Sequence, residues 1–345
     1  MLINRILIVG FGSIGKRHLR LARKLIPNAD IRVLRHQPSN DIPEQSNGCF
    51  SSIDDAILFA PQIAVIANPA SFHIPIAKRL AEIGVNLLVE KPLSNNLDGV
   101  AELIEICQKH DSCLLTGFNL RYLPSLKHFR DSLGEGIIGK ILSVRCEVGQ
   151  YLPSWRSNAN YQKGVSAQRN LGGGALLELS HEIDYLRWIF GEIEWVKASM
   201  SKQSSLEIDV EDTVHIIMSF MPKTSMHKLI AAVSLDFIRH DTTRICKAIG
   251  ENGSLRWNGI TGEVSIYESG AKEWRQVFSH KHKPDESYLA EWKDLIFCAK
   301  ENKIPLVTGE DGLKALQIIE AISKSSRAEG QVLGTLVSLP TMSLK

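Results

Sequence analysis

From residue 5 to about residue 120, short apolar runs alternate with segments in which apolar residues recur at helical spacing. Each apolar run is bounded by glycine, proline or polar residues, which is typical of strands buried in a sheet. Five strands are expected, at residues 5–10, 31–36, 62–68, 86–92 and 112–120. Helices are expected between them, at residues 13–26, 52–60, 71–84 and 96–110. Strict alternation of strand and helix predicts an α/β domain with a parallel, doubly wound sheet.

After residue 120 the pattern changes to one strand, a long polar segment, a strong helix and then a series of β-rich runs. We expect the strand at 139–151, the polar segment at 151–173 and the helix at 174–190. The β-rich runs lie at 194–203, 212–220, 228–237, 243–258, 262–269 and 273–279, and two closing helices lie at 286–301 and 309–327. Alternating apolar and polar residues predict a large, open, mostly antiparallel sheet with one face on solvent. The sequence therefore predicts two domains, an α/β domain at 1–120 and an α+β domain at 121–345.

Composition narrows the class of protein. The chain is 44% hydrophobic and 23% charged with a net charge of +2, so nothing in its charge favours nucleic acid or a membrane surface. No apolar run is long enough to span a bilayer. The six cysteines are scattered without a C-x-x-C pair, which argues against a zinc site and against a disulfide framework. No metal-ligating residues are predicted. The first predicted strand begins within a few residues of Met1, leaving no room for a signal peptide, and a cytoplasmic protein is expected.

The first strand runs directly into the sequence GFGSIG, which opens the first helix. In this G-x-G-x-x-G pattern Gly10 permits a tight turn, Gly12 lets the backbone approach a pyrophosphate, and Gly15 lets helix and strand pack closely. Free N–H groups at the helix start suit phosphate oxygens. The alternative is that these glycines only form a compact turn. The strand–turn–helix context favours dinucleotide binding, and so a Rossmann domain over 1–120.

The end of the second strand distinguishes NAD from NADP. NAD-binding domains usually place an acidic residue there, on the ribose 2′-hydroxyl. Here the position is occupied by Arg35 and His36, while Asp30 lies at the opposite end of the strand. An arginine can pair with a 2′-phosphate and stack on adenine, and Ser39 could add a donor. We therefore expect NADP(H) to be favoured over NAD(H), the alternative being a solvated loop arginine.

Ligands of such sheets bind outside the carboxyl ends of the strands. The residues just after the third, fourth and fifth strands are Asn68, Pro69, His73, Glu90, Lys91, Pro92, Asn119, Arg121 and Tyr122. They are expected to line one crevice at the nicotinamide end of a dinucleotide. Lys91 is unusual because it ends a buried strand. Its alternative role is a plain ion pair with Glu90.

The segment GGGALLELSHEIDYLRWIFG predicts a core-facing helix with a polar arc. At about 100° per residue, that arc holds Glu178, His181, Glu182 and Tyr185, with Asp184 beside it. A histidine among carboxylates can serve as an acid–base group. Taken alone, the pattern favours an ordinary helix surface with a satisfied histidine.

The polar segment at 151–173 is too long for a mere linker. Its candidates for contacts with a cofactor or substrate are Trp155, Arg156, Tyr161, Gln168 and Arg169. The alternative is a solvated loop.

Four stretches in order, GFGSIGKRH, EKPLS, GFNLRY and GGGALLELSHEIDYLRWIFG, together resemble the glucose–fructose oxidoreductase/inositol dehydrogenase (Gfo/Idh/MocA) family over essentially the whole chain. The resemblance implies a Rossmann domain followed by an α/β domain whose large open sheet binds substrate and makes oligomer contacts, so a homodimer or homotetramer is expected. It also implies NAD(P)-dependent oxidation or reduction of a sugar or cyclitol. Similar polar segments occur in members linked to bacterial surface-sugar biosynthesis, so the substrate could be a nucleotide-linked sugar.

The resemblance also implies roles for single residues. Lys91 approaches both nicotinamide and the substrate hydroxyl, and the Lys91–Pro92 bond is a candidate cis peptide. The family often has D-x-x-x-H-x-x-D in the later helix, with the histidine as acid–base. Here His181 and Asp184 keep their spacing, but Glu178 precedes the histidine by three residues.

The candidate catalytic residues are therefore Lys91, His181, Asp184 and Glu178. The candidate cofactor-binding residues are Gly10, Gly12, Ser13, Ile14, Gly15, Arg35, His36, Asn68, Pro69, His73, Glu90, Lys91, Asn119, Arg121, Trp155 and Arg156.

Two other functions remain open from the sequence. The chain could be a cofactor-binding regulatory protein without turnover, although retention of both Lys91 and His181 argues against this. It could also be a hydrolase or epimerase that oxidises its substrate transiently, with no net redox change.

Overall fold

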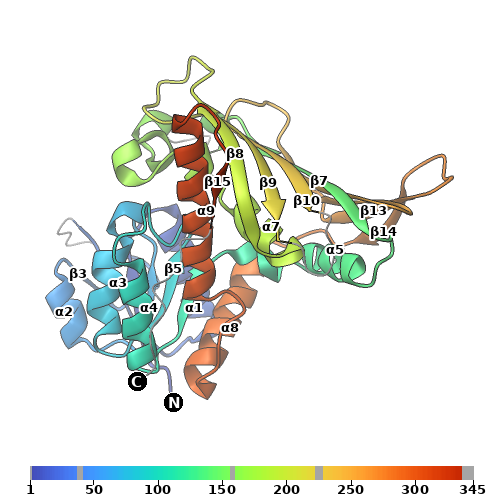
Figure 1. Cartoon of the computed structure of the whole chain (residues 1–345). Coiled ribbons are helices and arrows are strands. Elements are labelled where there is room, and N and C mark those ends of the chain that lie inside the picture. Colours follow the sequence, from blue (N-terminus) through green and yellow to red (C-terminus); the bar gives the residue numbers. More distant parts are fainter. Residues whose placement is uncertain (1, 37–41, 156–159, 222–227, 336–345) are drawn as a thin grey trace, which may run out of the picture. The chain divides into compact units, whose positions relative to one another are not determined.

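The computed structural model of the chain describes residues 2–36, 42–155, 160–221 and 228–335 (Figure 1). It divides into two units. Unit 1 contains Met1–Tyr122, Asn170–Gly172 and Pro284–Leu316, and unit 2 contains Leu123–Arg169, Gly173–Lys283 and Gln317–Lys345. Each unit is described by itself.

Unit 1 is built on a parallel six-stranded sheet in the order β3-β2-β1-β4-β5-β6. The strands are β1 (Arg5–Val9), β2 (Asp30–Leu34), β3 (Gly48–Phe50), β4 (Ile63–Ile66), β5 (Asn86–Glu90) and β6 (Leu114–Gly117). This strand order is that of a Rossmann domain, so the predicted doubly wound fold is confirmed. The short strand β3 was not anticipated, because three residues carry too little periodicity to be recognised.

The helices of this part of the chain follow the predicted alternation. They are α1 (Ser13–Leu25), α2 (Ile53–Leu58), η1 (Ala70–Phe72), α3 (His73–Ala81), α4 (Val100–Lys109) and η2 (Asn119–Tyr122). Strands β4, β5 and β6 are buried along their whole length, which explains their continuous apolar sequence.

Helix α8 (Glu286–Glu301) belongs to unit 1, although it lies near the end of the sequence (Figure 1). Its Trp292, Leu295 and Cys298 are part of the same buried cluster as Ile6 and Ile8 of β1. The predicted single domain boundary near residue 120 does not account for Pro284–Leu316, which belongs to unit 1. Helix α9 (Gly309–Arg327) then begins in unit 1 and ends in unit 2.

Unit 2 contains a nine-stranded sheet in the order β14-β13-β12-β11-β7-β10-β9-β8-β15. Among the described strands of this sheet, β7 and β10 alone pair in parallel, so the predicted mostly antiparallel sheet is confirmed. The strands are β7 (Ile141–Gly149), β8 (Ile193–Ser201), β9 (Thr213–Phe220), β10 (Leu229–Asp236), β11 (Thr243–Gly250), β12 (Gly253–Asn258), β13 (Glu263–Glu268), β14 (Arg275–Ser279) and β15 (Leu333–Gly334).

Helix α5 (Pro124–Gly134) packs against β12 and β13. The polar segment after β7 contains four short 3₁₀ turns, η3 (Leu152–Ser154), η4 (Tyr161–Lys163), η5 (Val165–Ala167) and η6 (Arg169–Leu171). It is therefore an ordered part of the fold over its described residues.

The single helix predicted at 174–190 is wrong. The structure has two helices, α6 (Ala175–Glu178) and α7 (His181–Phe190), separated by a turn at Leu179 and Ser180. At the junction Glu182 N–H donates to the Leu179 carbonyl, a three-residue step that interrupts the α-helical ladder. Periodicity alone could not reveal the break, because the apolar spacing continues across it.

Candidate functional site

The glycine turn after β1 admits no side chain at two of its three glycines. Gly10 has φ +87°, and a Cβ there would lie 2.7 Å from the Asn68 backbone nitrogen. A Cβ on Gly15 would lie 2.1 Å from the Gly10 carbonyl oxygen. A Cβ on Gly12 would meet nothing within 4 Å, so this residue faces open space. No side chain caps the N-terminus of α1, where the N–H groups of Ser13 and Ile14 begin the helix. This arrangement fits a pyrophosphate.

A cationic cluster lies at the end of β2. The Arg35 guanidinium carbon is 4.4 Å from the centroid of the Phe11 ring, and Lys16 Nζ is 5.3 Å from the same centroid. Arg35 Nε is buried and has no hydrogen-bond partner among the described residues. His36 is exposed. Ser39, the predicted additional donor, lies outside the described residues.

The exits of β4 and β5 are joined by a buried histidine. His73 Nε2 lies 2.8 Å from the Asn68 carbonyl oxygen, and Nδ1 lies 3.1 Å from the Pro92 carbonyl oxygen. Burial lowers the pKa of His73, so the ring is neutral and donates to one carbonyl at a time. The Lys91–Pro92 peptide bond is cis, which confirms the expectation from the EKP sequence.

Two further polar atoms at this edge are buried without a hydrogen-bond partner in the described part of the chain. They are Asn68 Oδ1, next to Pro69, and Ser71 Oγ. Buried polar atoms normally have partners. Their orphaned state therefore fits a polar ligand at the carboxyl edge of the sheet. Ser71 was not recognised from the sequence, because a serine after a strand is common in loops.

The carboxylate of Glu90 is buried, and each of its two oxygens has a hydrogen-bond partner. His18 Nε2 is 2.8 Å from Glu90 Oε1, and the Lys91 N–H donates to Oε2 at 3.1 Å. Burial by itself raises the pKa of Glu90, but the hydrogen bond from His18 and the charge of Lys91 outweigh it and hold that pKa below its usual value. Glu90 therefore remains ionised inside the protein.

A second carboxyl group, Glu291 of α8, lies fully buried in the same unit, and neither of its oxygens has a hydrogen-bond partner among the described residues. Burial and the negative charges of Glu90 and Asp294 raise the pKa of Glu291 well above its usual value. Glu291 is therefore held as the neutral acid.

The raised pKa of Glu291 has a consequence for stability. Above the pKa that Glu291 has in the unfolded chain, the unfolded state releases this proton while the folded state keeps it, so the stability falls as the pH rises. Glu291→Gln, which cannot ionise, is expected to be more stable than the parent at about pH 8, with a smaller difference at about pH 5. Urea unfolding at both pH values measures this. Glu105→Gln on the exposed face of α4 is the control, and equal stability changes at both pH values would contradict the assignment.

The predicted site residues that follow β6 form hydrogen bonds and an ion pair within unit 1. Asn119 Nδ2 donates to Ser287 Oγ at 3.1 Å, and the buried Arg121 pairs with Asp311 at 3.1 Å. The Tyr122 hydroxyl donates to Asp294 at 2.6 Å. These contacts hold the segment Pro284–Leu316 on unit 1. A role of Asn119 and Arg121 in cofactor binding stays a prediction.

In unit 2, the break between α6 and α7 changes the predicted polar arc. Glu182 is fully buried, and its carboxylate pairs with Arg244 Nε of β11 at 2.8 Å. Tyr185 is also fully buried, with its hydroxyl 3.1 Å from Cys146 Sγ. Both side chains therefore belong to the interior of unit 2. Glu178 and His181 are partly exposed, and Asp184 is buried beside the turn.

The triple glycine before α6 is required by close backbone contacts. A Cβ on Gly173 would lie 2.3 Å from the Val165 carbonyl oxygen. Gly174 has φ +113°, and a Cβ there would lie 2.4 Å from Glu211 Oε1. That same oxygen accepts the Leu176 N–H at 3.0 Å. The polar segment and Glu211 thus fix the start of α6.

The structure describes Trp155, one of the two aromatic candidates in the polar segment. Trp155 Nε1–H donates to the Gln150 carbonyl at 3.0 Å, and its ring meets Phe237 edge-on at 5.1 Å. Its contact with a cofactor stays a prediction. Arg156 lies outside the described residues.

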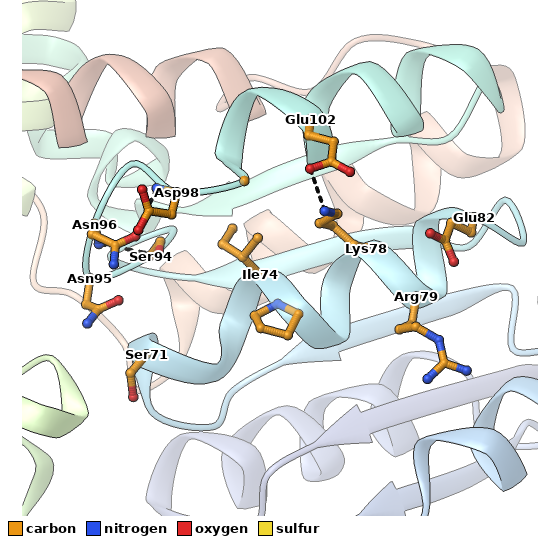
Figure 2. Close-up of a pocket in the computed structure, with 12 residues that line it drawn as sticks. Ser71, Ile74, Lys78, Arg79, Glu82, Ser94, Asn95, Asn96, Asp98 and Glu102 are labelled. Carbon is orange, nitrogen blue, oxygen red and sulfur yellow. Dashed lines mark hydrogen bonds and ion pairs between the residues drawn. The ribbon is translucent and has the colours of Figure 1, made fainter.

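A pocket of about 590 Å³ lies between α3 and α4 of unit 1, and Figure 2 shows its lining. Lys78 and Glu102 of its lining are paired at 2.5 Å. Arg79 of the lining pairs with Asp54, which lies outside the lining, at 2.7 Å. Ser71 and Asn95 line one end of it. None of the residues predicted to bind the cofactor lines this pocket.

In the part of the chain that the structure describes, no helix combines the length and apolar character needed to cross a membrane.

Comparison with known proteins agrees with this architecture. The family model described as "Oxidoreductase family, NAD-binding Rossmann fold" matches residues 4–118. The model described as "Oxidoreductase family, C-terminal alpha/beta domain" matches residues 130–333.

Individual relatives differ in how much of their length is matched. An uncharacterized oxidoreductase of Synechocystis is 30% identical, over 47% of this chain and 43% of the relative. The myo-inositol 2-dehydrogenase of Thermotoga maritima is 28% identical, over 93% of this chain and 96% of the relative. Among solved structures, the WlbA dehydrogenase of Bordetella pertussis in complex with NADH and UDP-GlcNAcA superposes with a TM-score of 0.78 at 20% identity, over 96% of this chain and 99% of that one.

Proposed function

Because this chain belongs to the Gfo/Idh/MocA oxidoreductase family, we propose that it transfers a hydride between NADP(H) and a hydroxyl-bearing carbon of a sugar or cyclitol, a class that includes nucleotide-linked sugars. The observation that carries the proposal is the carboxyl edge of the unit 1 sheet. There a glycine turn, a cationic cluster and orphaned buried polar atoms lie at successive strand ends. The substrate class is supported by two relatives. One is named a myo-inositol 2-dehydrogenase, and the other is a dehydrogenase in complex with UDP-GlcNAcA.

The residues present fit a dinucleotide along this edge. The open side of Gly12 and the first turn of α1 would hold the pyrophosphate. Arg35 and Lys16, gathered around Phe11, would hold the adenosine end and its 2′-phosphate. Asn68 and Ser71 would meet the nicotinamide end. When bound, the cofactor supplies the nicotinamide carbon that accepts or returns the hydride.

The protein's own part is proton transfer and orientation. In the oxidation direction the carbon loses a hydride and the hydroxyl loses a proton, leaving a carbonyl. In the proposed reaction His181 takes that proton, and the charge of the Lys91 ammonium group stabilises the negative charge that develops on the substrate. The buried Asp184 orients the imidazole, and the more exposed Glu178 binds substrate hydroxyls.

The proposal extends to assembly and to the division of labour between the domains. Residues 1–120 hold the cofactor, and residues 121–345 hold the substrate and form a homodimer or homotetramer through the large sheet. Ile217 of β9 is exposed on that sheet, which supports an interface there.

Turnover tests the proposed function directly. The purified protein is incubated with NADP⁺ or NAD⁺ and, in turn, with myo-inositol, D-glucose and UDP-GlcNAcA, and formation of reduced cofactor is followed by absorbance. Accumulation of reduced cofactor with any of these supports the proposal. Conversion of a sugar without such accumulation would instead identify a hydrolase or epimerase. Tight cofactor binding without any conversion would favour a regulatory protein.

The preference for NADP(H) makes a separate prediction. Arg35→Asp is expected to weaken NADPH binding by about 100-fold and to reverse the preference towards NADH, because a pairing charge is replaced by a repelling one. Thermal unfolding with each cofactor titrated separately measures this, since a ligand specific to the folded state raises its stability.

Arg5→Asp, the same change at the opposite end of the sheet, is the matched control and is expected to leave the order of the cofactors unchanged. Stronger stabilisation of the parent protein by NADH than by NADPH would overturn the NADP assignment.

A further inference from the structure

A chain of buried hydrogen bonds leads from α8 to the catalytic end of β5. The Trp292 indole N–H donates to His18 Nδ1 at 2.9 Å. His18 Nε2 lies 2.8 Å from Glu90 Oε1, and Glu90 Oε2 accepts the backbone N–H of Lys91 at 3.1 Å. His18 and Trp292 are both fully buried, and Glu90 is 7% exposed. All four residues lie in unit 1.

The Trp292 indole determines which atom donates and which atom accepts in each of these hydrogen bonds. An indole nitrogen can only donate, so His18 Nδ1 must accept and carries no proton. The single ring proton then resides on Nε2 and points at the Glu90 carboxylate. Both oxygens of Glu90 therefore receive an N–H donor, one from His18 and one from Lys91.

We propose that Trp292 and His18 are positioning residues that act on Lys91 by holding the Glu90 carboxylate and, through it, the backbone that leaves β5. This inference rests on the proposed role of Lys91 in catalysis. The packing on the other side supports it. A Cβ on Gly117 of β6 would lie 3.0 Å from both Glu90 Cα and Oε2, so glycine at this position leaves the space beside β6 that the Glu90 carboxylate occupies.

The charges around Glu90 show why it needs these donors. The titratable groups that act on it come from three helices and the adjacent residue: His18 of α1, His73 of α3, Tyr288 and Glu291 of α8, and Lys91. Burial works against the ionised form of Glu90. The two N–H donors and the Lys91 charge oppose that tendency and keep a carboxylate at the catalytic edge.

Glu90→Gln tests the arrangement, because a carboxamide can accept only one of the two N–H groups. Its NH₂ must face either His18 Nε2–H or the Lys91 N–H, so kcat is expected to fall about tenfold while the Kd of the reduced cofactor, measured by its fluorescence, stays unchanged. Trp292→Phe keeps an aromatic ring but removes the indole donor. Its kcat is expected to fall about threefold.

The double variant gives the decisive comparison. Without the indole, His18 can move its proton to Nδ1, and Nε2 can then accept from the NH₂ of the substituted residue 90. Glu90→Gln with Trp292→Phe is therefore expected to turn over faster than Glu90→Gln alone. Two merely structural defects would multiply and make the double variant slower, which would overturn the proposal. Trp274→Phe and Glu105→Gln, in unit 2 and on the surface of α4, are the matched controls.

Kinetics use whichever of myo-inositol, D-glucose and UDP-GlcNAcA gives the highest turnover, and a second readout needs no substrate. In ¹⁵N-histidine-labelled protein, the His18 signal, identified by its loss in His18→Gln, is expected to show a neutral ring protonated at Nε2. In Trp292→Phe that tautomer is no longer enforced. A His18 ring protonated at Nδ1 in the parent protein would refute the proposal. A further outcome separates this proposal from the proposed function. If Lys91→Met loses turnover while Glu90→Gln and Trp292→Phe keep the kcat of the parent, the positioning role of Trp292 and His18 is refuted and the proposed function still stands.

Discussion

Lys91→Met is expected to lower kcat by about 10³-fold while leaving cofactor affinity within about twofold of the parent. Methionine keeps the unbranched stem and most of the volume of lysine but removes the ammonium group. The cis Lys91–Pro92 bond and the hydrogen bond from the Lys91 N–H to Glu90 belong to the backbone, so both are retained. The loss therefore reports the charge against the substrate oxygen rather than the fold.

Steady-state kinetics with the best sugar of the panel, together with fluorescence titration of the reduced cofactor, measure the two quantities separately. Lys109→Met on the exposed end of α4 is the matched control and is expected to behave as the parent. Unchanged kcat in Lys91→Met would remove Lys91 from the mechanism, and the inference about Trp292 and His18 would fail with it.

His181→Asn is expected to reduce kcat by roughly 10²- to 10⁴-fold, the usual contribution of a positioned acid–base group. Asparagine can still form a hydrogen bond at this position but cannot take a proton from the hydroxyl. His181 begins α7 directly after the turn at Leu179 and Ser180, so a polar replacement there disturbs no helix interior.

The dependence of the oxidation rate on pH distinguishes proton transfer from simple binding. In the parent protein the rate is expected to decline towards acid pH as the imidazole takes up a proton, and in His181→Asn this decline is expected to disappear. His215→Asn on β9, whose side chain is exposed and lies near Ser234 Oγ, is the control. A variant that keeps both the rate and the acid limb would show that another group accepts the proton, and Glu178 would be examined next.

The features that were predicted correctly from the sequence depend on residues that lie close together along the chain. Alternating periodicity over 5–120 predicted the doubly wound sheet, because a buried parallel strand must be apolar on both faces. The spacing of Gly10, Gly12 and Gly15 predicted a tight turn between β1 and α1, and the structure gives the steric reason, a Gly10 carbonyl oxygen 2.1 Å from any Cβ on Gly15. The EKP sequence and its family resemblance predicted the cis bond.

The residues that were misjudged depend on distant neighbours. Glu182 and Tyr185 read as members of a polar helix arc, but Arg244 and Cys146 on other elements draw them into the interior of unit 2. Arg35 was recognised, whereas the Phe11 ring beneath it and the second cation at Lys16 were not. The only sequence signal for His18 was its place on the apolar face of α1, three residues after Gly15.

The chain's local pattern was thus sufficient for the class of fold, the glycine turn and the strand end that carries Lys91, since each depends on residues within a few positions of one another. Which buried groups support those strand ends depends instead on contacts between remote parts of the chain. Trp292 meets His18 across 274 positions of sequence, and α8 joins unit 1 because its apolar face completes the core around β1. A helix's periodicity shows that it has an apolar face, but the surface which that face covers is chosen by packing, and packing exists only in the folded molecule.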